Sequence, residues 1–206
     1  MKTSLVFTLI VAVMLVFAGV GYAQISGTDH DFSSAGWNSG GEICEPCHTP
    51  HNAKTAATNA PLWNHQITSA TFTLYSGYDL DATMGQPDGS SKLCLSCHDG
   101  TVALENFGDV TNGSNYITGD ALLGTDLSDD HPVSFVYNAA LATSDGELHD
   151  PTNTNSGLGS TIDADMLDSN DKLQCASCHD PHDNTNSPFL IKTNAASALC
   201  LTCHDK

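Results

Sequence analysis

Arginine is absent from this chain and lysine is scarce. The sequence contains six Lys and no Arg against 24 Asp and Glu, which gives a formal net charge of −18. Proteins that bind nucleic acids need a basic surface to neutralise the phosphates. The composition therefore excludes nucleic acid as a partner and predicts an acidic, well-solvated surface.

Long apolar runs are also absent after the first residues. Residues 5–20 form an apolar stretch that follows Lys2 and ends at Gly21-Tyr22-Ala23, a small-x-small cleavage pattern. This arrangement predicts a signal peptide over residues 1–23, with cleavage after Ala23. A membrane anchor is the alternative, but the cleavage pattern favours removal, and no nearby Cys could carry a lipid. We therefore expect an exported mature chain, residues 24–206, without membrane insertion.

The mature sequence has little material for a hydrophobic core. Asn, Asp, Ser, Thr and Gly dominate long stretches, so side-chain burial alone would not offset the entropy lost on folding. Segments 72–78 and 133–137 carry β-branched and aromatic residues and predict short strands. A brief helix is expected around each of the Cys-x-x-Cys-His motifs described below, for instance over residues 195–204, with Asn194 as a possible cap. The expected fold is mostly irregular coil with a few short helices and minor β-structure.

Cysteine, in contrast, is plentiful and regularly placed. All eight Cys fall in four Cys-x-x-Cys-His motifs, the attachment pattern of c-type haem. Two thiols at this spacing reach the two vinyl groups of a porphyrin, and the following imidazole binds the iron. Disulfides or zinc are the alternatives, but neither requires a His after every pair. The sequence predicts four covalent haem c groups, held by Cys44, Cys47 and His48; Cys94, Cys97 and His98; Cys175, Cys178 and His179; Cys200, Cys203 and His204.

The motifs form an internal repeat. Motifs one and three continue with Pro-His, which places His51 and His182 three residues beyond the motif. Motifs two and four share the pattern Leu-Cys-Leu-x-Cys-His-Asp. The pair occurs twice. We therefore expect one haem-packed domain, 24–206, with haem pair one at about 24–107, a connecting segment at about 108–171 and haem pair two at about 172–206.

Six further His residues could supply the second axial ligand of each iron. Four haems need four such distal ligands, so ligation by two His is favoured over ligation by Met84 or Met166. His51 and His48 are at most about 11 Å apart at Cα, whereas opposite ligands of one iron need roughly 13 Å. His51 should therefore cross to another haem, and we expect the one on His98.

The same reach argument assigns His182 to the haem on His204. His149 has a polar setting and is expected at the surface. The haems on His48 and His179 draw on a set that the sequence leaves open: His30, His65, His131 and His149. His30 lies on an N-terminal arm from which it could act in trans.

Together with the doubled motifs, three segments carry a family resemblance: 30–33 (HDFS), 61–65 (PLWNH) and 131–133 (HPV). The chain resembles the paired-motif multihaem c-type cytochromes of metal-reducing bacteria, and is similar to extracellular tetrahaem cytochromes that polymerise into nanowires (OmcE-like). The resemblance implies haems with two His ligands in alternating parallel and T-shaped stacks, and one distal His donated by the next subunit. It also implies a head-to-tail homopolymer that exchanges electrons with other cytochromes or extracellular acceptors.

The sequence predicts electron transfer without substrate chemistry. A multihaem reductase is the main alternative, but it needs an open iron position and cationic groups around an anionic substrate. The lack of Arg and the surplus of His speak against it. We expect an extracellular or cell-surface location, with a soluble periplasmic carrier as the alternative.

Overall fold

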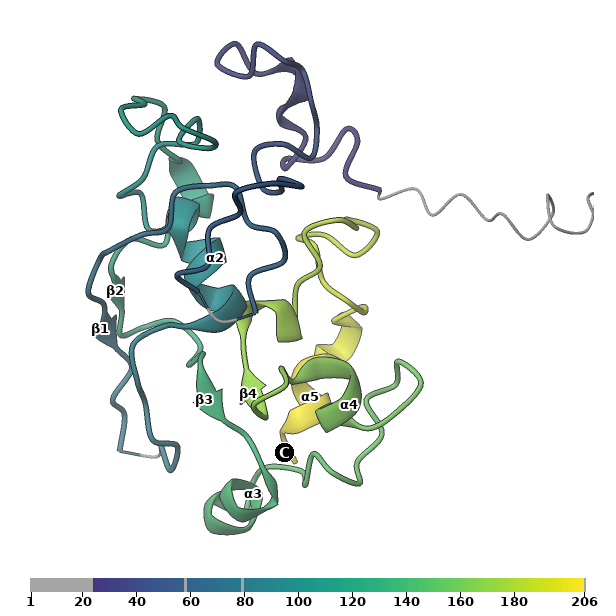
Figure 1. Ribbon diagram of the computed structural model, residues 1–206. Coiled ribbons are helices and arrows are strands. Elements are labelled where there is room, and N and C mark those ends of the chain that lie inside the picture. Colours follow the sequence, from purple (N-terminus) through teal and green to yellow (C-terminus); the bar gives the residue numbers. More distant parts are fainter. Residues whose placement is uncertain (1–23, 58, 79, 206) are drawn as a thin grey trace, which may run out of the picture.

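The computed structural model describes residues 24–57, 59–78 and 80–205, so the expected signal peptide lies outside the described residues (Figure 1). Most of the described chain is turn, bend or coil, which confirms the expected fold class. The longest helix of the described part is α2, Gly89–His98, which contains motif two. No helix in the described ranges is long and apolar enough to cross a membrane.

Two small sheets connect parts of the chain that are distant in sequence. β1 and β2 pair in parallel, whereas β3 and β4 pair antiparallel. β1 and β3 lie within the two segments predicted as strands, but each is only two residues long. β3 starts late because Ser134 before it has a left-handed backbone, with φ of 64°. The strand bounds are Thr73–Leu74 (β1), Asp126–Leu127 (β2), Phe135–Val136 (β3) and Lys172–Leu173 (β4).

The segment between the two haem pairs is structured. It supplies β2 to the first pair and β3 to the second, together with two helices. Helix α3, Ala139–Asp145, begins where the Asn138 side chain accepts hydrogen bonds from the backbone N–H groups of residues 140 and 141. Helix α4, Ile162–Met166, begins in the same way at Thr161. Figure 1 shows β3 and α3 next to the C-terminal part of the chain.

Short helices accompany three of the four motifs. Motif three lies on the 3-10 helix η3, Cys175–Ser177, and motif four on α5, Cys200–Cys203. The helix predicted over 195–204 is divided into η4, Ala195–Ser197, and α5. Within η4, Ala196 and the next residue have left-handed φ values of 52° and 61°, which interrupt a continuous helix. Motif one forms only a turn, so the predicted helix there is wrong. The remaining 3-10 helices are η1, Phe32–Ser34, and η2, Gly119–Ala121.

The buried apolar side chains form two small clusters. The larger lies around β3, α4 and α5, and the smaller beside β1, β2 and α2. Met166 belongs to the larger cluster, and this packing explains its presence without iron ligation. The members are Phe135, Tyr137, Ala142, Ile162, Met166, Leu173, Leu199 and Cys203 in one, and Phe72, Leu95 and Leu127 in the other.

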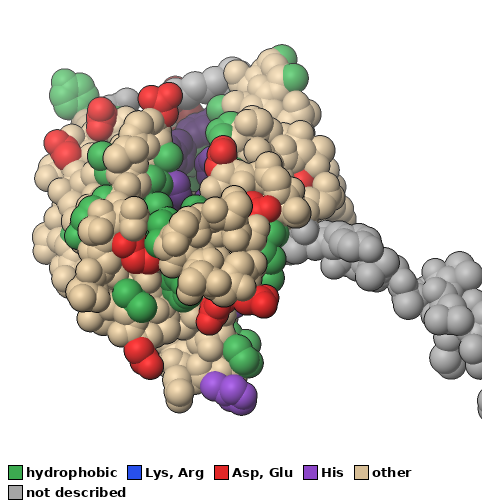
Figure 2. All heavy atoms as spheres, turned by 90° about the horizontal axis from the view of Figure 1, so that it is seen from above, with side chains coloured by type: hydrophobic (Ala, Val, Ile, Leu, Met, Phe, Trp, Pro, Cys, Tyr) green, Lys and Arg blue, Asp and Glu red, His purple; other side chains and the backbone are tan. Residues whose placement is uncertain are grey.

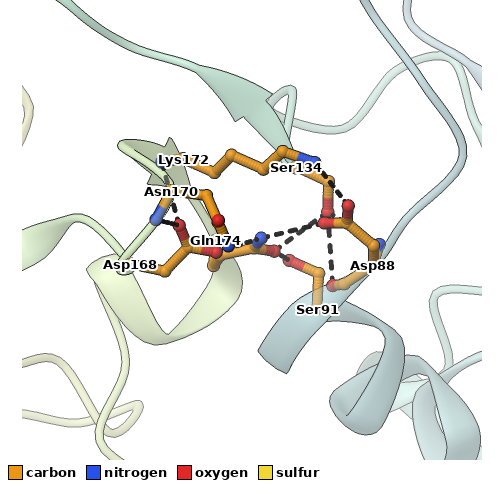
Figure 3. A network of polar contacts seen from close by, with 7 residues as sticks. All are labelled: Asp88, Ser91, Ser134, Asp168, Asn170, Lys172 and Gln174. Atoms are coloured by element: carbon orange, nitrogen blue, oxygen red, sulfur yellow. Dashed lines mark hydrogen bonds and ion pairs between the residues drawn. The ribbon is translucent and has the colours of Figure 1, made fainter. Parts of the chain in front are cut away.

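A buried polar network joins motif two to motif three (Figure 3). The Gln174 side chain, 2% exposed, accepts hydrogen bonds from the hydroxyls of Ser91, at 2.6 Å, and Ser134, at 2.9 Å. Its amide nitrogen donates to the carboxylates of Asp88, at 3.0 Å, and Asp168, at 2.9 Å. All four hydrogen-bonding positions of this amide are therefore filled.

The start of α2 is shaped to fit that amide. Gly89 has φ of 49°, and a Cβ there would lie 2.8 Å from the Gln174 amide nitrogen, so only glycine fits. Lys172 forms an ion pair with Asp88, and the backbone N–H of Cys175 donates to the Ser91 hydroxyl at 3.0 Å. Helix α2 and η3 are thus held in one fixed arrangement.

Candidate haem-binding sites

None of the eight cysteines forms a disulfide. Burial raises the pKa of Cys47 to about 11, of Cys97 to about 12, and of Cys178 and Cys203 to about 11. Each of these is the second Cys of its motif. Zinc is bound by thiolates, and a raised pKa disfavours the thiolate form of these cysteines. Within the described ranges, no group of three or more His, Cys, Asp or Glu side chains has the arrangement of a metal site.

The first cysteines of motifs two and three contact one another. A hydrogen bond from the Cys94 thiol lowers the pKa of Cys175, and the same bond raises the pKa of Cys94. The contact follows from the network that fixes α2 against η3. It brings the attachment points of two haems together, although their motifs lie far apart in the chain.

Backbone carbonyls orient three of the four proximal His rings. A carbonyl oxygen has no proton to give, so Nδ1 of the ring donates and Nε2 keeps its lone pair for a metal. Metal-binding His residues are usually held by such an outer hydrogen bond. These bonds run from His48 to Pro61 at 2.7 Å, from His98 to Ala121 at 2.8 Å, and from His179 to Pro188 at 2.9 Å.

Three proximal rings each face a second His ring. Two imidazoles on one iron have ring centres roughly 6 Å apart, because each nitrogen lies about 2 Å from the metal and each ring centre about 1 Å farther. The observed pairs are His30 and His98 at 6.2 Å, His48 and His182 at 6.0 Å, and His131 and His204 at 6.3 Å. The spacing of the ring centres in these pairs is therefore that of two imidazoles on one iron.

These pairs differ from those expected from reach along the chain. His182, which we assigned to the haem on His204, faces His48 instead. The position beside His98, which we assigned to His51, is taken by His30. The reach of the chain excludes His48 and His51 as ligands of one iron, but it could not show that His rings near motif one contact those near motif three.

The three second rings are oriented in the same way as the proximal ones. The Nδ1 atoms of His30, His131 and His182 donate respectively to the Pro181 carbonyl at 3.4 Å, to the Pro132 carbonyl at 2.9 Å and to the Asp180 carboxylate at 3.0 Å. Burial, and then the nearby His98, lower the pKa of His30, which keeps its imidazole neutral. Figure 2 shows His side chains gathered in a hollow of the face drawn, with acidic side chains distributed around it.

The other three candidate His residues have different settings. His65 is buried, and both of its ring nitrogens lie near backbone carbonyls, of Gln66 at 2.8 Å and of Ala103 at 3.0 Å. The ring also lies beside the thiol of Cys97, with its Nε2 3.6 Å from Sγ, and the role of His65 as a distal ligand stays a prediction. His149 is half-buried beside motif four, where its backbone N–H donates to the Cys203 carbonyl. His51 is exposed.

Sequence reasoning missed the segments that orient two of the proximal rings. His48 forms an isolated antiparallel bridge with Trp63, and His179 forms one with Leu190. The signal was present, because both segments follow an Asn-x-Pro triplet, 59–61 in one and 186–188 in the other.

The model of a protein family described as 'Doubled CXXCH motif' matches residues 169–206 of this chain, which include motifs three and four. The chain carries the motif of multihaem c-type cytochromes. No curated protein matches the chain significantly. As in multihaem cytochromes, the motifs indicate covalently bound haem c and a role in electron transfer.

Proposed function

We propose that this chain is an exported tetrahaem electron carrier in which two His residues ligate each iron. The observation that carries the proposal is the set of three His ring pairs, 6.0 to 6.3 Å apart, each including one motif His. When bound, haem supplies a metal that accepts and releases single electrons. The protein residues fix the position and the electronic environment of that metal.

The paired His rings suit electron transfer better than catalysis. A reductase needs an iron with an open axial position for its substrate, whereas two imidazoles fill both positions. The Nδ1 bonds to carbonyl and carboxylate oxygens hold the rings in place, so little has to move when the iron changes charge. With no Arg and six Lys, the chain also offers little to bind an anionic substrate.

The test is to count haems and to record their spin states in the purified holoprotein. Mass spectrometry should give the mature chain plus four haems, and electron paramagnetic resonance should show only low-spin iron. The variant His131→Ala should convert one haem in four to high spin, while the control His149→Ala should leave all four low-spin. Three or fewer haems would contradict the count, and a high-spin haem in the wild type would favour a reductase.

We further propose that subunits associate head to tail outside the cell. Two different exposed apolar side chains support such a contact: Leu62, 58% exposed near motif one, and Leu201, 43% exposed within motif four. A contact between unlike surfaces gives open filaments when its rotation does not close. His30 faces His98 of its own chain. The proposed association therefore relies on the exposed apolar side chains and not on His30 as an iron ligand in a neighbouring chain.

Electron microscopy of secreted material tests this association. Leu201→Asp should abolish filaments, whereas Leu158→Asp, at a leucine 40% exposed outside the motifs, should leave them intact. A strictly monomeric wild-type protein would contradict head-to-tail association and leave the soluble periplasmic carrier.

A further inference from the structure

Motifs one and three fold into two copies of the same local unit. We call residues 44–64 unit A and residues 175–191 unit B. In both, the backbone N–H of the proximal His donates to the carbonyl of the first Cys, at 2.8 Å in unit A and 3.0 Å in unit B. Both chains then continue through Pro to a second His, His51 in unit A and His182 in unit B.

The turn that presents this second His is the same in both units. In unit A, the backbone N–H of His51 donates to the Thr49 hydroxyl at 3.4 Å. In unit B, the backbone N–H of His182 donates to the Asp180 carboxylate at 2.9 Å. In each case the acceptor is the residue directly after the proximal His, so the second His leaves the motif in the same manner.

The returning segment also matches. Thr49 N–H donates to the Leu62 carbonyl at 2.9 Å, and Asp180 N–H donates to the Phe189 carbonyl at 2.8 Å. Leu62 and Phe189 share a left-handed backbone, with φ of 55° and 57°. One residue earlier, a proline carbonyl accepts from Nδ1 of the proximal ring in both units. The two units therefore share the same turns and the same pattern of hydrogen bonds, although their sequences differ.

The second His of unit B, His182, already contacts the proximal His of unit A, His48. The rings of His182 and His48 lie 6.0 Å apart with an interplanar angle of 16°. His51 holds in unit A the place that His182 holds in unit B, and among the described residues His179 is the proximal His without a second His ring at this spacing. The counterpart of the His182–His48 contact is a contact from His51 to His179.

We propose that His51 is the distal ligand of the haem on His179, within the same chain. This inference rests on the proposed function, because it completes the ligand set of the same haems. His51 is exposed, and the Nδ1 of His179 is engaged with Pro188, so the His179 Nε2 is the atom left to bind iron. The haems of units A and B then form a reciprocal pair, and every iron receives both ligands from one chain.

The test is a double-mutant cycle read by spin state in the holoprotein. His51→Ala should make one haem in four high-spin, as should His179→Ala alone. If both residues serve one iron, the double variant should still have a single perturbed haem, because the two changes act on the same site. The control His149→Ala should leave four low-spin haems.

Two perturbed haems in the double variant, or four low-spin haems in His51→Ala, would overturn the assignment. Dilution of the wild type to a monomer should leave all haems low-spin, and loss of one low-spin signal on dilution would instead place the ligand on a second chain. A crystal structure of the wild-type holoprotein gives an independent reading should the variants fail to mature. If that structure shows His51 Nε2 bound to an iron other than the one bound by His179, the pairing is refuted. A wild type with fewer than four haems would instead refute the proposed function.

Discussion

At the scale of single residues, the role of each His follows from the acceptor of its Nδ1 proton. His48, His98, His131 and His179 donate to neutral backbone carbonyls, whereas His182 donates to the carboxylate of Asp180. A charged acceptor draws the proton away more strongly and makes the ring a better electron donor. Such a ligand stabilises oxidised iron, so we expect the haem between His48 and His182 to have a lowered reduction potential.

Asp180→Asn should raise the potential of that haem. The amide oxygen can still accept the Nδ1 proton, but the negative charge is lost. Hydrogen bonds to charged groups contribute about 1.5–3 kcal/mol, against about 0.5–1.5 kcal/mol for neutral ones. The loss of about 1–1.5 kcal/mol corresponds, for one electron, to a rise of roughly 40–65 mV. Spectroscopic redox titration should show one of the transitions shifted upward. Asp183→Asn, in the same loop, serves as the charge-matched control, and an equal shift there would show that only net charge matters.

At the scale of elements, the sequence predicts the presence of local structures better than their extent. β1 and β3 form where β-branched and aromatic residues cluster, and helices form at motifs two and four. Single backbone conformations limit their extent: a left-handed φ at Ser134 precedes β3, and one at Ala196 interrupts the helix expected before motif four. Left-handed conformations at residues other than glycine are imposed by tertiary contacts, so no local pattern signals them.

The element that most depends on tertiary structure is the junction of α2 and η3. Gln174→Ala would remove the amide and leave the buried hydroxyls of Ser91 and Ser134 without their acceptor. Unsatisfied buried polar groups cost roughly 1–3 kcal/mol each, so the variant should lose about 3 kcal/mol of unfolding free energy. Chemical denaturation of the holoprotein measures this difference.

Asn170→Ala is the matched control for the junction. Asn170 lies in the same network region with an exposed side chain, so its loss should cost under about 0.5 kcal/mol. Equal stability of the two variants would show that the network does not hold α2 against η3.

At the scale of the whole molecule, the sequence shows where haem attaches but not which parts of the chain meet. The motif spacing alone predicts the Cys and proximal His residues, because that chemistry is local. The ring pairs are not local: His182 reaches His48, and His30 reaches His98. The connecting segment has the polar composition typical of a linker, yet it supplies a strand to each of the two sheets. Contacts of this range depend on the packed structure and leave no short pattern in the sequence.

The whole molecule should fold only with haem. The described apolar core consists of two small clusters, and one of these includes Cys203, a predicted haem attachment point. Side-chain burial on this scale does not offset the entropy of ordering so much coil. The four apolar macrocycles expected between the His rings would supply the missing interior.

A chain with all eight Cys changed to Ser should therefore be largely disordered. Serine keeps the size of cysteine but cannot form thioethers, so the change removes haem and alters little else. Circular dichroism should lose the signal of α2, and limited proteolysis should cleave the variant at many sites while the haem-loaded wild type resists. The double variant Cys200→Ser and Cys203→Ser is the graded control, since it should retain three haems and an intermediate resistance. A compact, protease-resistant chain without haem would show that the two clusters and the Gln174 network suffice for the fold.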